Sequence, residues 1–321
     1  MDPAQFLTAS GVIIVAGKGG VGKTAVTAAL AVAASTVGLR TLVVEVEGKG
    51  TMASLFESDR LSYEELVLIE AAVDHAGVSA RTVTPDDALL EHLADRGLQR
   101  LSNRLVSSGL LDMVATAVPG IRDILVLGKV KQLERSGDWD LILLDAPAAG
   151  HAITFLRSAR GLVDAVKVGP INTQAQEVLD LLTDAARCRV MLVTVPEETP
   201  VNELVETAYS LEDQVGVALA PVVVNGVYPH LAGLAVDPER AAEELGVGLV
   251  AGESDLLREA AAFRSARTEL QDQQLHRMAD ELPLPQLHLP YLFSSELGRE
   301  ELDELAAQLV RRIEALPAVG S

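Results

Sequence analysis

The fold is decided by the stretch Gly17-Lys-Gly-Gly-Val-Gly-Lys-Thr24, which follows an apolar, β-branched run at 12–16 and precedes an alanine-rich run at 25–34. Its four glycines let the backbone turn and bring successive N–H groups close to an anion, and the positive end of the next helix reinforces that attraction. In this pattern Lys23 lies along the β and γ phosphates of a nucleotide and Thr24 binds Mg²⁺. The sequence therefore predicts a phosphate-binding loop, with a tight turn that binds nothing as the alternative.

This loop supplies most of the expected nucleotide contacts. They are Gly17, Lys18, Gly19, Gly20, Val21, Gly22, Lys23, Thr24 and Ala25.

Composition limits the function classes. The 321 residues are 49% hydrophobic and carry a net charge of −20, which disfavours nucleic acid and anionic membranes as partners because both attract clusters of Lys and Arg. The longest uncharged stretch, 24–39, is shorter than a spanning helix, and residues 1–6 lack the basic and apolar segments of a secretory signal. The lone Cys188 excludes an intrachain disulfide and fits a reducing compartment. We therefore expect a cytoplasmic protein with no integral membrane segment.

Strands and helices alternate along the chain. Apolar runs at 41–46, 141–145, 190–195 and 221–225 predict strands, and the segments between them show helical periodicity. Such alternation is typical of the α/β class, with a mostly parallel sheet covered by helices on both faces. Residues 51–137 contain no evident strand but three helix-like segments, at 63–72, 85–104 and 119–135. We expect a single domain over 1–321 with an inserted helical subdomain at 51–137.

Several segments in order resemble one family. The second lysine of the loop, Lys18, resembles the deviant phosphate loop of a class of dimeric ATPases. Pro119-Gly-Ile121 is similar to the PGI segment of the ArsA-type ATPases, which include the arsenical-pump and tail-anchored-protein targeting ATPases. Further matches are Asp145-Ala-Pro-Ala-Ala-Gly-His151 to their switch II, and the stretches 193–200, 224–227 and 289–293 to their later nucleotide-side segments. The chain is identified by these motifs as a divergent member of the ArsA-type P-loop NTPases.

The resemblance implies an ATPase that uses ATP and Mg²⁺ and works as a dimer. Lys18 would reach the phosphates held by the partner subunit, or else be a solvated loop lysine. Asp145 would hold a Mg²⁺-bound water, with a helix N-cap as the alternative role. Asn225 would bind the adenine edge, or else be a turn residue beside Gly226. The late segment would add adenine-side contacts from Pro290, Tyr291 and Leu292.

The departures from the family are as informative as the matches. The switch I aspartate that positions the attacking water is replaced by Glu47, and two switch II threonines by Ala146 and Ala149. Because phosphoryl transfer depends on positioning, we expect slow hydrolysis. The family's CxxC zinc pair is missing, since Cys188 is alone, so a dimer would have to hold together without zinc.

The sequence leaves two functions open. The first is an ATP-hydrolysing switch, a homodimer or a heterodimer with a paralogous ATPase, whose helical subdomain presents an apolar groove to a hydrophobic client. The second is a weakly active regulatory subunit paired with such a paralogue. Residues that could line the groove, or else form the subdomain core, are Leu105, Leu110, Leu111, Met113, Val114, Ile121, Ile124, Leu125 and Leu127.

Overall fold

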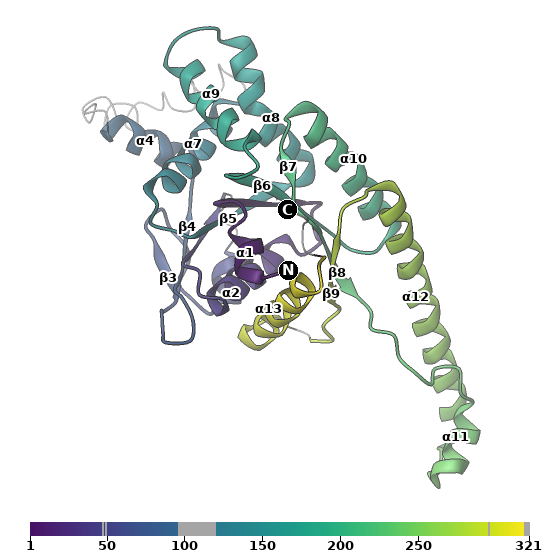
Figure 1. The fold of residues 1–321 in the computed structure, drawn as a ribbon. Coiled ribbons are helices and arrows are strands. Elements are labelled where there is room, and N and C mark those ends of the chain that lie inside the picture. Colours follow the sequence, from purple (N-terminus) through teal and green to yellow (C-terminus); the bar gives the residue numbers. More distant parts are fainter. Residues whose placement is uncertain (47, 49, 96–119, 295, 318–321) are drawn as a thin grey trace.

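The computed structural model describes residues 1–321 except 47, 49, 96–119, 295 and 318–321 (Figure 1). Its centre is a nine-stranded sheet in the order β3-β4-β2-β5-β1-β6-β8-β9, with β7 pairing with β6. The strands are β1 Val12–Gly17, β2 Thr41–Glu45, β3 Leu66–Ile69, β4 Val78–Thr82, β5 Leu141–Ala148, β6 Cys188–Thr194, β7 Ala218–Leu219, β8 Val222–Val227 and β9 Gln286–Pro290.

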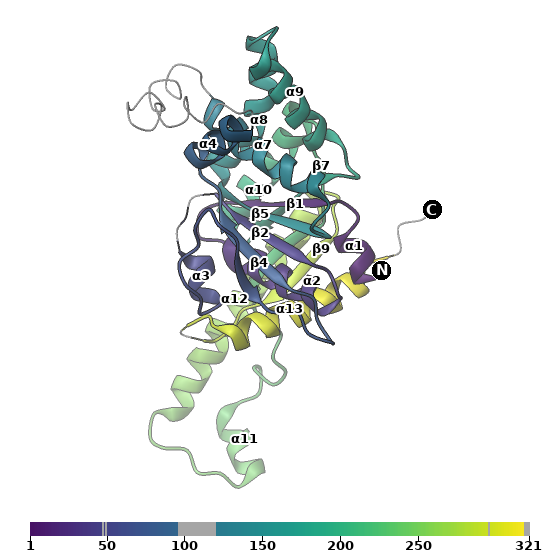
Figure 2. The same cartoon turned by 90° about the vertical axis from the view of Figure 1, so that its left-hand side faces the viewer.

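Helices cover both faces of the sheet (Figure 2). On one face lie α4, α7, α8, α9 and α10, and on the other α1, α2, α3 and α13. The helix bounds are α1 Pro3–Leu7, α2 Lys23–Thr36, α3 Thr51–Leu55, α4 Pro85–Asp95, α7 Ile121–Ser136, α8 Ala149–Ala165, α9 Pro170–Thr183, α10 Glu198–Gln214, α11 Pro238–Leu245, α12 Glu253–Glu281 and α13 Arg299–Glu314. The predicted α/β architecture is confirmed.

The central strand β1 shows why the sheet is covered on both sides. It pairs in parallel with β5 and with β6, so neither of its edges is open. Val12 and Ile14 pack into the core layer beneath α7 to α10, whereas Ile13 and Val15 pack against α2 and α13. Because side chains alternate across a strand, a continuous apolar run fills two core layers at once. Pairing on both edges and packing on both faces therefore fix the end of β1, where the glycine loop begins.

Two strands lie in the segment 51–137, where we expected none. β4 pairs in parallel with β2, and β3 pairs antiparallel with β4 at the sheet edge. The helix expected at 63–72 is therefore wrong, because strand pairing with β4 outweighs the local helical pattern of a four-residue stretch. The helices expected at 85–104 and 119–135 are present as α4 and α7 within the described residues. The inserted subdomain at 51–137 stays a prediction. Within that range, β3 and β4 are strands of the central sheet.

One part of the chain extends away from the body. Residues 229–267, which we call the arm, contain α11 and the first half of α12, and they project outward in both views (Figures 1 and 2). α11 has no buried residue, and α12 buries only Thr268, Gln271 and Met278 along its 29 residues. The arm is therefore fixed to the body mainly through the second half of α12.

Two further sequence expectations concern the interior and the membrane. Cys188 is fully buried in β6, and burial raises the pKa of its thiol to about 12, so it behaves as a small core residue. No helix within the described part of the chain combines the length and apolarity needed to cross a bilayer.

Candidate nucleotide-binding site

The predicted phosphate loop connects β1 to α2 at the carboxyl end of the central strand. Gly20 and Gly22 both have φ of +88°, which favours glycine. A Cβ atom on Gly17 would lie 2.2 Å from the carbonyl oxygen of Val193, so the loop passes too close to β6 for any side chain there. Val21 is buried beneath the loop. These constraints give the backbone the tight path that an anion cradle needs.

Lys23 is the first residue of α2 and folds back over the loop. Its Nζ donates a hydrogen bond to the carbonyl oxygen of Lys18 at 3.2 Å. The ammonium group is thereby held above the backbone that would surround the phosphates. This arrangement agrees with the predicted role of Lys23 as a phosphate contact.

Thr24 and Asp145 lie together at the loop. The Thr24 hydroxyl donates to Oδ2 of Asp145 at 2.8 Å, and Asp145 is 8% exposed on β5, next to β1. A hydroxyl and a carboxylate are the oxygen ligands that Mg²⁺ prefers, and this ion keeps its remaining positions for waters and phosphate oxygens. Among the described residues no group of three or more His, Cys, Asp and Glu side chains could hold a metal ion. The donor set therefore fits Mg²⁺ shared with a nucleotide and not an all-protein metal centre.

A second buried carboxylate, Glu45, was missed by the sequence reasoning. Glu45 ends β2, is 4% exposed, and is the register neighbour of Asp145 on the adjacent parallel strand. Its Oε2 accepts a hydrogen bond from the Thr82 hydroxyl at 3.3 Å. The available signal was an acidic residue closing an otherwise apolar strand. Glu47, the expected water-positioning residue, lies outside the described residues, so its role stays a prediction.

Asn225, predicted to bind adenine, supports the phosphate loop. Its Nδ2 donates to the carbonyl oxygen of Val21 at 3.0 Å. A Cβ atom on Gly22 would lie 2.4 Å from that same nitrogen, so the end of β8 is in direct contact with the loop. The adenine contact of Asn225 stays a prediction, and the structure adds a scaffolding contact that the sequence did not indicate.

The expected base-side residues adjoin Asn225. β9 ends at Pro290, the Tyr291 N–H donates to the Val227 carbonyl oxygen at 2.9 Å, and Leu292 packs against the core. The Tyr291 ring lies 4.8 Å from the Tyr228 ring. Phe293, from the same predicted segment as Tyr291, joins these two rings, and Arg264 lies over Tyr228 and Phe293. We call this group the aromatic cluster: Tyr228, Tyr291, Phe293 and Arg264, of which the sequence did not indicate Tyr228 and Arg264. Exposed rings at this place offer a flat apolar surface to a base.

Lys18 is paired within its own chain. Its Nζ lies 2.5 Å from Oε1 of Glu203 on α10, and the two side chains are 37% and 40% exposed. The pair is accessible to water, so it can exchange for another partner at small cost. The sequence predicts that Lys18 reaches the phosphates of a partner subunit or else is a solvated loop lysine, and it gave no sign of Glu203, which lies 185 residues away.

Of the nine residues proposed to line a client groove, five lie outside the described residues: Leu105, Leu110, Leu111, Met113 and Val114. The other four are on α7. Ile124 and Leu127 are 1% exposed and belong to the main core, and Leu125 packs against it. These α7 residues therefore fit the alternative role, packing in the core, better than lining a client groove.

Comparison with known proteins shows which family this chain resembles. A model of the anion-transporting ATPases matches residues 10–169, which include the phosphate loop and Asp145. The ATPase BagA of Mycobacterium tuberculosis is 32% identical over 328 aligned positions, which cover 92% of each chain. A putative arsenical pump-driving ATPase of Halobacterium salinarum is 22% identical over 91% of this chain and 43% of its own length. The ATPase get3 of Schizosaccharomyces japonicus is 26% identical over 54% of this chain and 53% of its own.

Proposed function

Because the chain belongs to the anion-transporting ATPase family, we propose that it is a Mg²⁺-dependent ATPase whose nucleotide state controls association with a second ATPase subunit. The observation that carries the proposal is the hydrogen bond from Thr24 to Asp145 beside the glycine loop. In that contact the two predicted magnesium ligands meet, Thr24 from the first turn of α2 and Asp145 from β5.

Each residue of the loop has a defined task in this proposal. The backbone N–H groups of 17–24 and Nζ of Lys23 bind the phosphates, with Asn225 holding the loop from behind. Thr24 and Asp145 would hold Mg²⁺, which when bound offsets the negative charge that accumulates on the phosphates. Glu47, which replaces the switch I aspartate, would accept the proton of the attacking water.

Association with a second subunit rests on Lys18. In the single chain this lysine is bonded to Glu203, half-exposed at the surface. A nucleotide phosphate on a facing subunit would be a stronger acceptor than a solvated carboxylate, because it carries more charge and becomes desolvated at the contact. The facing subunit would be a second copy or a paralogue. Binding of a hydrophobic client remains a further, separate prediction.

Phosphate release and ATP binding should be measured on the same preparations of wild type, Lys23→Ala and Glu47→Gln. The proposal predicts binding and slow release by wild type, loss of both in Lys23→Ala, and binding without release in Glu47→Gln. ATP binding with no release by wild type would instead assign the chain to the regulatory class of subunit. A wild type that binds no ATP by calorimetry would overturn the proposal.

A further inference from the structure

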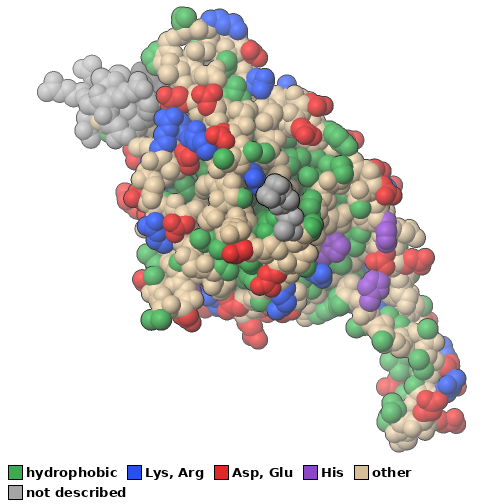
Figure 3. Space-filling view, in the orientation of Figure 1, with side chains coloured by type: hydrophobic (Ala, Val, Ile, Leu, Met, Phe, Trp, Pro, Cys, Tyr) green, Lys and Arg blue, Asp and Glu red, His purple; other side chains and the backbone are tan. Residues whose placement is uncertain are grey.

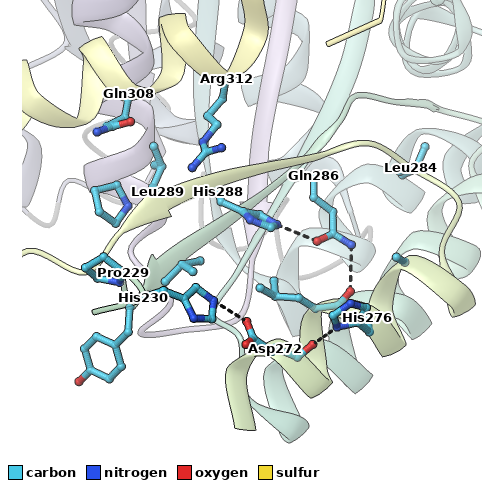
Figure 4. Close-up of a pocket in the computed structure, with 15 residues that line it drawn as sticks. Pro229, His230, Asp272, His276, Leu284, Gln286, His288, Leu289, Gln308 and Arg312 are labelled. Atoms are coloured by element: carbon cyan, nitrogen blue, oxygen red, sulfur yellow. Dashed lines mark hydrogen bonds and ion pairs between the residues drawn. The ribbon is translucent and has the colours of Figure 1, made fainter. Parts of the chain in front are cut away.

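A cavity of about 770 Å³ lies at the open edge of the sheet (Figure 4), and no residue of the phosphate loop lines it. It is bounded by the edge strand β9, by α12, and by the carboxyl-terminal half of α13. A volume of this size is typical of sites for small molecules. The sequence motifs reach this cavity only through Val227, Leu289 and Pro290, and the other lining residues belong to none of them.

The polar lining of the cavity is unusual for this acidic protein. Half of its six histidines line it, namely His230, His276 and His288, and Arg312 reaches it from α13. Histidine side chains gather near the base of the arm in the space-filling view (Figure 3). Among the described residues that line it, Asp272 is the one acidic residue. A chain with a net charge of −20 therefore presents a cavity in which basic groups outnumber carboxylates.

Asp272 is already engaged. Its Oδ1 lies 3.3 Å from Nε2 of His230. Arg312, by contrast, has no ion pair with any carboxylate in the described part of the chain. Its guanidinium offers five N–H donors in a planar fork that matches the oxygens of a carboxylate or a phosphate. Arg312 is thus the cationic group of the described lining that lacks a carboxylate partner.

The hydrogen bonds of two histidines determine which of their ring nitrogens a ligand could contact. Nδ1 of His276 lies 2.7 Å from the backbone carbonyl oxygen of Asp272. Because a carbonyl oxygen only accepts, Nδ1 carries the proton and Nε2 remains as an acceptor in the neutral ring. Nε2 of His288 lies 2.9 Å from Oε1 of Gln286 and donates to it. A ligand with hydroxyl groups can therefore donate to His276.

The rest of the lining is apolar. Leu275, Leu284 and Leu289 form part of the wall, together with Ala279 of α12. The wall is fixed through Gln271, whose amide accepts from the Tyr228 N–H at 2.8 Å and donates to the Gly226 carbonyl oxygen at 3.1 Å. The cavity thus combines an apolar surface with an arginine that lacks a carboxylate partner and a histidine ring nitrogen that can accept a hydrogen bond.

We propose that this cavity binds a small hydroxylated organic anion, whose carboxylate or phosphate group pairs with Arg312 and whose hydroxyl group donates to His276. The carbon body of the ligand packs on the leucine wall. The site goes beyond the proposed ATPase activity, because the phosphate loop contributes no residue to it and Pro290 is its one expected nucleotide contact among the described lining residues.

Histidine ring NMR signals of the full chain test this site, with citrate and glycerol 3-phosphate as probes at constant ionic strength. One probe should shift the His276 and His288 signals in a saturable manner, and the tighter probe identifies a carboxylate or a phosphate ligand. Burial and the charge of Arg312 lower the pKa of His288, with Asp272 acting in the opposite direction. An anion on Arg312 should therefore raise the pKa of His288.

Matched variants separate binding from charge effects. Arg312→Gln should weaken the probe about tenfold or more, since it removes a charge-assisted contact. Arg311→Gln, a neighbouring exposed arginine outside the cavity, should leave it unchanged. Ala279→Trp should block the cavity without changing any charge.

Three results would overturn the proposal. The first is shifts that do not saturate and are equal in wild type, Arg312→Gln and Arg311→Gln. The second is a probe that binds Ala279→Trp as well as wild type. The third is competition between the probe and ATP on wild type, which would return the cavity to the nucleotide site. Lys23→Ala should bind the probe normally, because Lys23 does not line the cavity. The cavity proposal can therefore be tested even if the ATPase proposal fails.

Discussion

The phosphate side and the base side of the candidate nucleotide site are built in different ways. The phosphate side is one continuous stretch, β1, the glycine loop and α2, in which every residue of α2 from Ala25 to Ser35 is buried. The base side is assembled from three separated segments around Tyr228, Arg264 and Tyr291, and its rings are partly exposed. One side is part of the core, and the other lies on its surface.

The difference shows which side of the site can accept amino-acid substitutions. A loop enclosed by β6, β8 and α2 tolerates almost no change in shape, since a single added Cβ atom at Gly17 or Gly22 meets another atom at 2.4 Å or less. The aromatic cluster is partly exposed and includes Arg264 of the arm, so its contacts can vary without disturbing the core. We therefore expect substitutions on the phosphate side to abolish function and those on the base side to tune it.

The largest effect should come from the loop lysines. Lys23→Ala should weaken ATP binding by about 100-fold or more, because it removes contacts of a full charge with the phosphates. Lys18→Ala, which removes the same charge from the same loop, should retain ATP binding by the single chain. Calorimetry on both variants measures the contrast. Equal losses in the two would mean that charge alone, and not the position of Lys23, determines binding.

A pair of glycines should separate steric fit from backbone strain. Gly22 and Gly38 have φ of +88° and +85°, but only Gly22 would place its Cβ near another atom, Nδ2 of Asn225 at 2.4 Å. Gly38→Ala should cost about 1 kcal/mol of unfolding free energy from strain. Gly22→Ala should cost about 2 to 4 kcal/mol and lose ATP binding. Urea unfolding measures both, and similar costs would show that Asn225 does not constrain the loop.

On the base side the expected effect is smaller. Tyr291→Ala should weaken ATP binding about tenfold, because stacking of a base on an aromatic ring contributes about 1 to 3 kcal/mol. Phe263→Ala, which removes an exposed ring of α12 outside the aromatic cluster, serves as the control and should have no effect. Calorimetric titration measures both. A normal affinity in Tyr291→Ala would exclude the aromatic cluster from the adenine site.

The smallest effect should come from Glu203. Since Glu203 competes for Lys18 with a facing subunit, Glu203→Gln should strengthen ATP-dependent association about two- to fivefold, in line with the weak free energy of exposed ion pairs. Glu206→Gln on the same helix is the matched control. Sedimentation in Mg²⁺ and a non-hydrolysable ATP analogue measures both. Weaker association of Glu203→Gln would show that this carboxylate helps the contact.

The sequence predicted the phosphate side well because its signal is local. The glycine pattern, the flanking strand and the helix occupy consecutive residues, and Asp145 ends a strand that reads as buried. The position of Asp145 beside Thr24 then follows from parallel pairing of β1 with β5. Glu45 could have been identified in the same way, because it is also an acidic residue at the end of an apolar strand.

Other features depend on contacts between distant residues. β3 is four residues long and pairs only with β4, so its local pattern resembled a helix. Glu203 meets Lys18 across 185 positions, and the cavity at β9 joins residues of a loop, two helices and a strand. No spacing rule connects such groups, because tertiary packing alone brings them together. The sequence motifs therefore covered the phosphate contacts and left the surface around them unassigned.

The central claim, that nucleotide bound to this loop controls association through Lys18, is tested most directly by analytical ultracentrifugation. Mg²⁺ with a non-hydrolysable ATP analogue should strengthen association of wild type with itself or with a paralogue, relative to ADP. A charge-assisted contact of about 1.5 to 3 kcal/mol corresponds to about ten- to a hundredfold per subunit. Lys18→Ala should lose this difference while still binding nucleotide. Equal association of wild type and Lys18→Ala in both nucleotide states, with and without the paralogue, would contradict the claim.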